Sequence, residues 1–226
     1  MKRLLAAALV STVLATPVVA ADLDDTLPPG YTSFVSVSFL YSFGILDQGF
    51  EITDGADRLS GSFDPEYALG ATLEAGVFLN ERVRLSSDVR YSRTQYDSVS
   101  LLGQTVNLRS GDVEADRVQV FVNAAYEVPL ADVGLAVPFF ERSSVFALVG
   151  VGLTNFELDL DGQSGDETAF TAKIGLGTAT AITDRVALVA ETNYIFGSDF
   201  TFEDGRDRLE FDNEEIVSTI GLRFSF

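Results

Sequence analysis

The feature that most constrains the fold is an alternation of apolar and polar residues with a period of two. It recurs in eight segments, at 34–44, 67–78, 82–93, 117–128, 145–156, 168–181, 186–196 and 215–226. In the first, Val35, Val37 and Phe39 alternate with Ser36 and Ser38. Because successive side chains of a strand point to opposite faces, each segment predicts a strand with one apolar and one polar face. No helical period of comparable strength occurs, so the sequence predicts an all-β fold.

The connections between these segments alternate in length. Asn80–Glu81 and Thr183–Asp184 are tight hairpin turns. The joins at 44–66, 94–116, 157–167 and 197–214 are long, acidic and rich in Gly and Asp. The join at 129–144 is expected on the same side as the tight turns. Short turns on one side and long loops on the other predict an eight-stranded antiparallel up-and-down transmembrane β-barrel over residues 34–226.

Alternation alone does not decide which face points inward, because a soluble lipocalin-like barrel encloses a ligand with its apolar face. Aromatic residues favour the opposite arrangement, since they gather near both ends of the strands as at two membrane interfaces. They are Tyr41, Phe43, Tyr67, Tyr91, Phe170, Tyr194 and Phe196 at the long-loop end, and Tyr126, Phe224 and Phe226 at the other. The polar face is rich in glycine, which suits close approach inside a narrow barrel. We therefore predict that the apolar face contacts lipid.

The polar face also carries equal numbers of acidic and basic residues: Glu74, Arg84, Asp88, Arg90, Glu127, Lys173, Glu191 and Arg223. A water-poor interior must pair its charges, whereas a solvent-facing surface need not. These residues are the predicted lumen charge network. Glu191 and Asp88 are expected to take Arg90, Lys173 or Arg223 as partners, although shear decides the pairing.

The N-terminal segment reads as a secretory signal peptide over residues 1–20, with Lys2 and Arg3 before an apolar run and small residues at Val18 and Ala20. Residues 21–33 are expected to be a periplasmic extension. Removing the signal leaves 13 basic and 34 acidic residues, a net charge of −21. This charge excludes nucleic acid as a partner, because its phosphates must be neutralised by Lys and Arg. The chain has no cysteine, so no disulfide holds the fold.

The final segment, "STIGLRFSF" (218–226), resembles the C-terminal assembly signal of bacterial outer-membrane barrels through Thr219, Gly221, Phe224 and Phe226. "FALVGVGLTNFEL" and "DRVALVAETNYIFG" are similar to the fifth and seventh strands of the OmpA-like, or porin-family, eight-stranded outer-membrane proteins of Gram-negative bacteria. The resemblance implies a monomer in the bacterial outer membrane. It also implies contact with outer-membrane lipid and lipopolysaccharide, and recognition by the outer-membrane insertion machinery.

The functional prediction is a structural or surface-interaction protein whose lumen is plugged by paired charges. Eight strands leave an interior just wide enough for side chains to fill. A narrow channel for small solutes is the alternative. The chain has no histidine, so no base of neutral-range pKa is present to activate a serine, and we predict no catalytic site.

No metal or cofactor site is predicted either. The D-x-D-G within "ELDLDGQSGDE" (157–167) is similar to a calcium loop, but the remaining EF-hand ligand spacing is absent. A solvated acidic loop is the preferred interpretation, and weak binding of divalent cations by the acidic loops is the alternative. The glycine pairs at 150/152 and 175/177 do not open a helix, which excludes a nucleotide-binding loop.

Overall fold

The computed structural model describes residues 32–43, 48–54, 57–102, 104–107, 113–134, 142–160, 163–204 and 207–226. The predicted signal peptide and nearly all of the predicted N-terminal extension lie outside these ranges. The described residues form the strands β1 (Thr32–Phe43), β2 (Gln48–Asp54), β3 (Asp57–Phe78), β4 (Val83–Leu101), β5 (Gln104–Asn107), β6 (Val113–Pro129), β7 (Ser143–Leu160), β8 (Gln163–Ala181), β9 (Val186–Gly197), β10 (Phe200–Asp204), β11 (Asp207–Phe211) and β12 (Glu214–Ser225), with one 3-10 turn, η1 (Leu130–Val133). Within these ranges, no helix is long and apolar enough to cross a bilayer.

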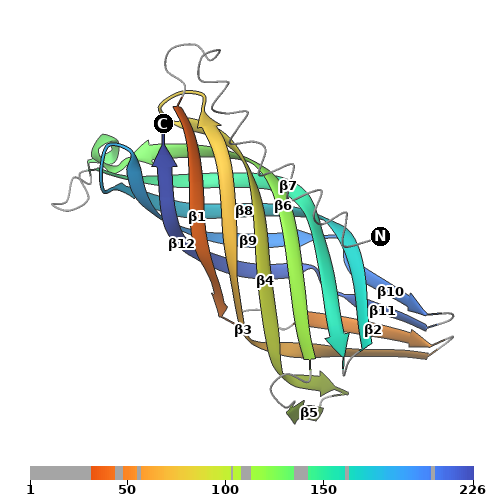
Figure 1. Cartoon of the computed structure of the whole chain (residues 1–226). Helices are drawn as coiled ribbons and strands as arrows, with labels where there is room; N and C mark the ends of the chain where they lie inside the picture. The colour runs from red at the N-terminus through yellow and green to blue at the C-terminus, as the bar shows by residue number, and fades with distance from the viewer. Residues whose placement is uncertain are drawn as a thin grey trace.

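Eight of the strands close into a ring in the order β1, β3, β4, β6, β7, β8, β9 and β12, with every neighbouring pair antiparallel (Figure 1). β1 pairs with β12 and so closes the ring, and Phe226 N donates to Ser33 O at 3.0 Å. All eight strands predicted from the alternation are confirmed, and the β6–β7 connection lies on the same side as the tight turns. The chain is therefore an eight-stranded antiparallel barrel.

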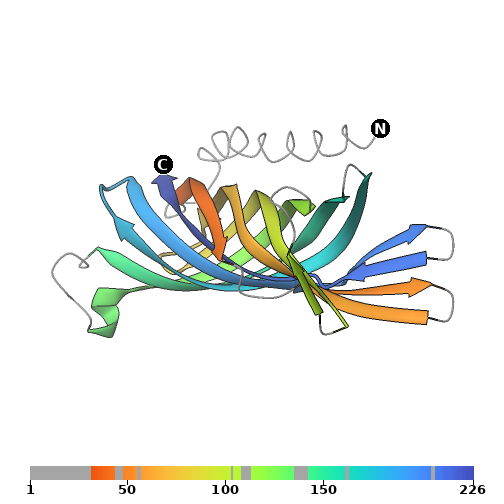
Figure 2. The same ribbon diagram turned by 90° about the horizontal axis from the view of Figure 1, so that it is seen from below.

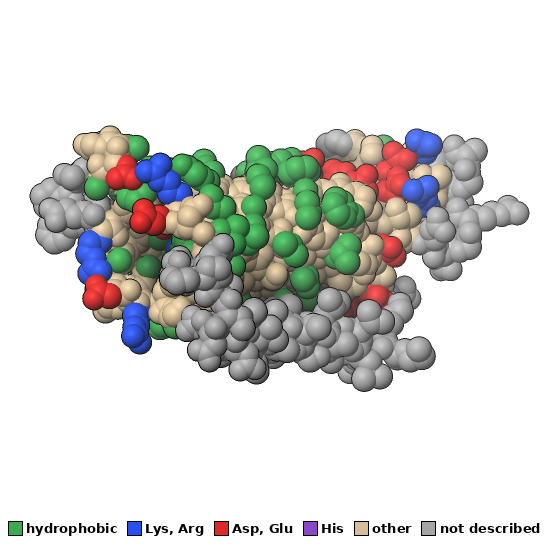
Figure 3. Space-filling view, turned by 90° about the horizontal axis from the view of Figure 1, so that it is seen from above, with side chains coloured by type: hydrophobic (Ala, Val, Ile, Leu, Met, Phe, Trp, Pro, Cys, Tyr) green, Lys and Arg blue, Asp and Glu red, His purple; other side chains and the backbone are tan. Residues whose placement is uncertain are grey.

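The two faces of the wall differ as the alternation predicts. Outward side chains such as Val37, Phe170 and Ile174 are 51–57% exposed, whereas inward Phe34 and Phe121 are 1% exposed or less. Hydrophobic side chains cover the middle of the visible wall, with acidic residues gathered at the end that carries the long joins (Figure 3). An apolar band of this kind is compatible with lipid and not with water.

The four long joins differ from the prediction, because much of each is strand rather than loop. β2, β5, β10 and β11 lie within them, and β3, β4, β7 and β8 extend into them. The physical reason is that these segments also alternate: Phe50 and Ile52 are interleaved with Glu51 and Thr53. β10, β11, β2 and the start of β3 pair side by side into a sheet that projects beyond the ring (Figure 2).

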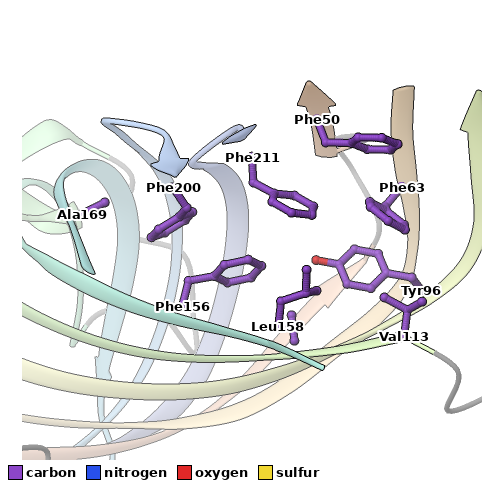
Figure 4. Packing of buried hydrophobic residues seen from close by; sticks show 10 residues of the cluster. Phe50, Phe63, Tyr96, Val113, Phe156, Leu158, Ala169, Phe200 and Phe211 are labelled. Atoms are coloured by element: carbon purple, nitrogen blue, oxygen red, sulfur yellow. The ribbon is translucent and has the colours of Figure 1, made fainter. Parts of the chain in front are cut away.

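A cluster of buried apolar residues attaches this projecting sheet to the mouth of the barrel (Figure 4). We call it the extracellular cluster, because the long joins of a transmembrane β-barrel are expected on the extracellular side; its members are Phe50, Phe63, Tyr96, Val113, Ala115, Phe156, Leu158, Ala169, Phe200 and Phe211. The Phe156 and Phe200 rings stack at 4.7 Å between centroids, and the Phe63 and Phe211 rings at 5.7 Å. The Tyr96 hydroxyl donates to Gln48 Oε1, and burial raises the pKa of Tyr96 to about 12. The extension is therefore held by its own core.

Candidate functional site

The lumen of the barrel is the candidate site, because the structure places all eight residues of the predicted charge network on its inward-facing positions. Five of them are 1–3% exposed: Arg84, Asp88, Arg90, Lys173 and Arg223. Glu127 and Glu191 are also largely buried, with side chains 12% and 10% exposed. Their positions follow from the two-residue period of each strand, since inward residues are separated by two along the chain.

A buried ion pair lies near the middle of the lumen. Lys173 Nζ on β8 is 2.6 Å from Asp88 Oδ2 on β4, and Asn123 Nδ2 donates to the same oxygen at 2.6 Å. Lys173 Nζ also lies 4.5 Å from the centre of the Phe121 ring. Because β6 and β7 separate β4 from β8 in the ring, this pair spans the interior rather than following the wall.

Closer to the tight turns, a second group forms around Glu127. Arg223 Nη1 donates to Glu127 Oε2 at 3.1 Å, and Arg84 Nη1 lies 4.0 Å from the same oxygen. The Arg84 guanidinium is 4.3 Å from the centre of the Phe146 ring. Phe146 fits because Gly177 faces it: a Cβ there would be 2.3 Å from the ring. This layer combines ion pairs with cation–π contacts.

The pairing differs from the expectation at Glu191. Its ion-pair partner is Arg84, at 4.0 Å, rather than Arg90, Lys173 or Arg223. Asn193 Nδ2 also donates to Glu191 Oε1, at 2.6 Å. The register of the closed ring determines this pairing, because it sets the height of each inward residue of β9 relative to those of β4. The sequence does not specify that register. The partner of Asp88, Lys173, is one of those expected.

Arg90 and Glu74 lie in the lumen without a close ion pair. Within the described ranges, no carboxylate oxygen lies within 4.0 Å of the Arg90 guanidinium nitrogens. Likewise, no nitrogen of a basic side chain lies within 4.0 Å of the Glu74 carboxylate oxygens. Both residues line a cavity of about 20 Å³, together with Asp88, Lys173 and Glu191. A space of this size holds about one water molecule.

A third layer, toward the extracellular cluster, was not predicted. Arg117 Nη1 lies 2.9 Å from Glu215 Oε2, and Gln119 Nε2 donates to Glu215 Oε1 at 2.7 Å. The Arg117 guanidinium lies 5.0 Å from the centre of the Phe156 ring. The signal was available in the sequence, since Arg117 shares the inward face with Gln119. Apolar residues separate this layer from the central pair: Leu40, Phe121, Ile195 and Val217.

Three residues of the predicted assembly signal lie on β12, and the fourth, Phe226, directly follows it. Phe224 and Phe226 point outward and are 43% and 45% exposed, and Thr219 and Gly221 occupy inward positions. A Cβ on Gly221 would be 2.2 Å from Ser38 Oγ, so β12 and β1 approach closely there. Their role in assembly stays a prediction.

No metal centre is present among the side chains that the structure describes, since no three acidic groups converge there. The predicted calcium-like segment is only partly covered: Asp161 and Gly162 lie outside the described residues. The described acids of the four joins do not gather around one point.

Comparison with known proteins gives a family and several structural relatives. Residues 6–224 match the family described as "Outer membrane protein beta-barrel domain". No curated protein matches the sequence. The outer-membrane protein OprG of Pseudomonas aeruginosa is similar in fold, with a TM-score of 0.61, 11% identity, and coverage of 87% of this chain and 96% of that one. The outer-membrane protein AlkL gives a TM-score of 0.50, 16% identity, and coverage of 87% and 90%. This chain therefore belongs to the outer-membrane β-barrel domain family and is a β-barrel protein of the bacterial outer membrane.

Proposed function

We propose that this protein is a non-conducting barrel with a structural or surface-interaction role, its lumen closed by paired side chains. The observation that carries the proposal is the Lys173–Asp88 pair, which crosses the interior at 2.6 Å with both side chains 3% exposed or less. Channels that select ions use rings of a single sign of charge. Here acidic and basic groups face each other in successive layers, an arrangement that favours closure.

The layers support closure along the length of the lumen. The Arg223–Glu127 group occupies the end near the tight turns, the Lys173–Asp88 pair the middle, and the Arg117–Glu215 pair the level below the extracellular cluster. Opening a path would require separating buried ion pairs. Each ion left without its partner would carry an uncompensated desolvation penalty on the order of several kcal/mol. The plug is therefore expected to be stable at rest.

The projecting sheet supports a surface role. The two joins that contain it, 44–66 and 197–214, hold 13 of the 34 acidic residues of the chain. Its outer face carries Glu51 and Glu210, which pair with Arg58 and Arg208 at its surface. Because the extracellular cluster fixes this sheet to the barrel, its surface is presented without a large ordering cost on binding. We propose a basic partner, or one bridged by divalent cations, and no catalytic step.

Planar-bilayer recordings test closure. The parent protein is expected to give no discrete conductance steps, whereas the Lys173→Ala/Asp88→Ala variant, which removes the central pair and its bulk, is expected to give small ones. Thr105→Ala, at an exposed site on β5, serves as the matched control and should stay silent. Conductance by the folded parent would replace the proposal with the narrow-channel alternative.

A further inference from the structure

A groove of about 680 Å³ crosses the outer wall of the barrel over β6, β7, β8, β9 and β12. Its outward lining includes Tyr126, Ala147, Leu176, Thr192 and Ser218, which stand opposite one another in a single row across the five strands. Ala190 and Thr178 add further small side chains beside this row. Phe146, Gly177, Glu191 and Thr219, which occupy inward positions, also border the groove, but most of its lining faces outward. The groove therefore belongs to the lipid-facing side of the wall.

The chemistry of the groove indicates an apolar occupant. Thr192 Oγ1 and Ser218 Oγ lie 3.0 Å apart and hydrogen-bond to each other, so these two hydroxyls need no polar group from outside. Water is absent from the hydrocarbon core, and an unfilled concavity loses dispersion contacts along its whole lining. A hydrocarbon chain provides those contacts.

The length and position of the groove indicate which chain. Four strand spacings of about 4.8 Å give a row roughly 19 Å long. One leaflet of the hydrocarbon core is about 15 Å deep, and strand tilt makes the row run obliquely through it. The row begins at Tyr126, which belongs to the aromatic girdle at the tight-turn, periplasmic end. The dimensions fit one acyl chain of the periplasmic leaflet.

The rim of the groove offers a partner for a phosphate. Arg82 Nη1 donates to the Tyr126 hydroxyl at 3.3 Å, at the point where the row begins. Arg82 is half exposed and also lies 3.1 Å from Asp132 Oδ2. Basic side chains are visible at this end of the molecule, whereas the opposite end is mainly acidic (Figure 3). Arginine suits phosphate because its planar guanidinium donates two parallel hydrogen bonds.

We propose that this groove binds a glycerophospholipid of the periplasmic leaflet, with one acyl chain along the row and the phosphate beside Arg82. The proposal does not depend on whether the lumen conducts, since the acyl chain lies along outward-facing side chains. It would hold one lipid in a fixed position, while the rest of the apolar wall is covered by exchanging lipid.

Native mass spectrometry of protein refolded into phosphatidylglycerol and phosphatidylethanolamine vesicles, then extracted in mild detergent, tests the site. The parent is expected to retain one phospholipid, and Thr178→Leu/Ala190→Leu, which fills the groove, to lose it. Ala71→Leu, an outward exposed site on β3 away from the groove, is the matched control. Arg82→Gln should retain phosphatidylglycerol roughly fivefold less, as for loss of one basic residue near an anionic headgroup. Arg58→Gln, at the extracellular end, should match the parent.

Equal lipid retention by the filled variant and Ala71→Leu would overturn the proposal, as would absence of retained lipid on the folded parent. Because the chain has no cysteine, a single Thr192→Cys also reports on a second copy as occupant. Efficient disulfide dimers of that variant in vesicles would assign the groove to a barrel–barrel contact and reject the lipid. Heat-modifiable migration on gels verifies that every variant is folded.

Discussion

Lys173 Nζ lies 2.6 Å from Asp88 Oδ2 across the interior of the barrel, joining strands that are not neighbours in the ring. Backbone pairing alone fixes only adjacent strands, so this contact adds a constraint on the cross-section of the lumen. Asn123 donates to the same carboxylate from β6. Lys173, Asp88 and Asn123 therefore link three strands through one oxygen, so a change at Asp88 affects all three strands.

Removal of one member of this pair is expected to cost more than removal of both. Lys173→Met leaves the Asp88 carboxylate buried without its cation, at a cost of about 3–5 kcal/mol in the free energy of unfolding. Adding Asp88→Asn should recover much of that loss, because no charge is then left unpaired. Urea unfolding of the refolded barrel in lipid vesicles, arranged as a double-mutant cycle, measures the coupling. Strictly additive losses would show that the two side chains act independently.

The pair that was not predicted provides a second test, with an adjacent control. Glu215 accepts from Arg117 and Gln119 inside the barrel, whereas Glu214 beside it is exposed. Glu215→Gln is expected to reduce the free energy of unfolding by about 1.5–3 kcal/mol, the range for a hydrogen bond to a charged group. Glu214→Gln should change it by less than about 0.5 kcal/mol, as for most surface sites. Similar effects of the two changes would place Glu215 outside the network.

The strands and their inward faces could be predicted from the sequence, whereas the pairing of charges inside the barrel could not. Period-two alternation identified eight strands and their inward faces, because lipid on one side and a packed lumen on the other act on every residue. It also held in β2, where Phe50 and Ile52 alternate, but the high acidic content made that segment read as a loop. The partner of Glu191 depends on shear, which arises from the closed ring and not from any single strand.

The lipid-facing assignment predicts a strong effect of charge on the outer wall. Val89→Arg on β4 places a cation near the bilayer midplane, which costs roughly 2–4 kcal/mol. The fraction of folded barrel after refolding into vesicles should therefore fall sharply. Thr105→Arg on the exposed strand β5 is the control and should fold like the parent. Normal insertion of Val89→Arg would mean that β4 turns its apolar face inward.

The extracellular cluster is expected to stabilise the projecting sheet locally. Phe211 is 1% exposed, and its ring lies 5.7 Å from those of Phe63 and Phe156. Phe211→Ala removes a buried aromatic side chain, a change worth about 3–5 kcal/mol. Limited proteolysis should then cut within β2, β10 or β11 while the ring stays intact. Phe39→Ala, at a 53% exposed lipid-facing site, is the control. Unchanged protease resistance of Phe211→Ala would show that the sheet is held by its backbone pairing alone.

Changes at Phe226 can distinguish a role in assembly from a role in the stability of the folded barrel. Phe226 is 45% exposed on the outer wall, and its backbone pairs with Ser33, where β12 meets β1. Unpaired backbone groups at a barrel seam cost several kcal/mol each in lipid, so β12 must pair on both sides. If Phe226 is also read by the insertion machinery, then deleting it, or adding a charged tag after it, should lower the yield of assembled barrel in cells. The yield of refolding in detergent should fall much less, since no recognition step occurs there.

Phe39→Ala controls for loss of one exposed aromatic ring and should assemble normally in cells. Equal losses in cells and in detergent would make Phe226 a packing residue of the seam, without a part in recognition.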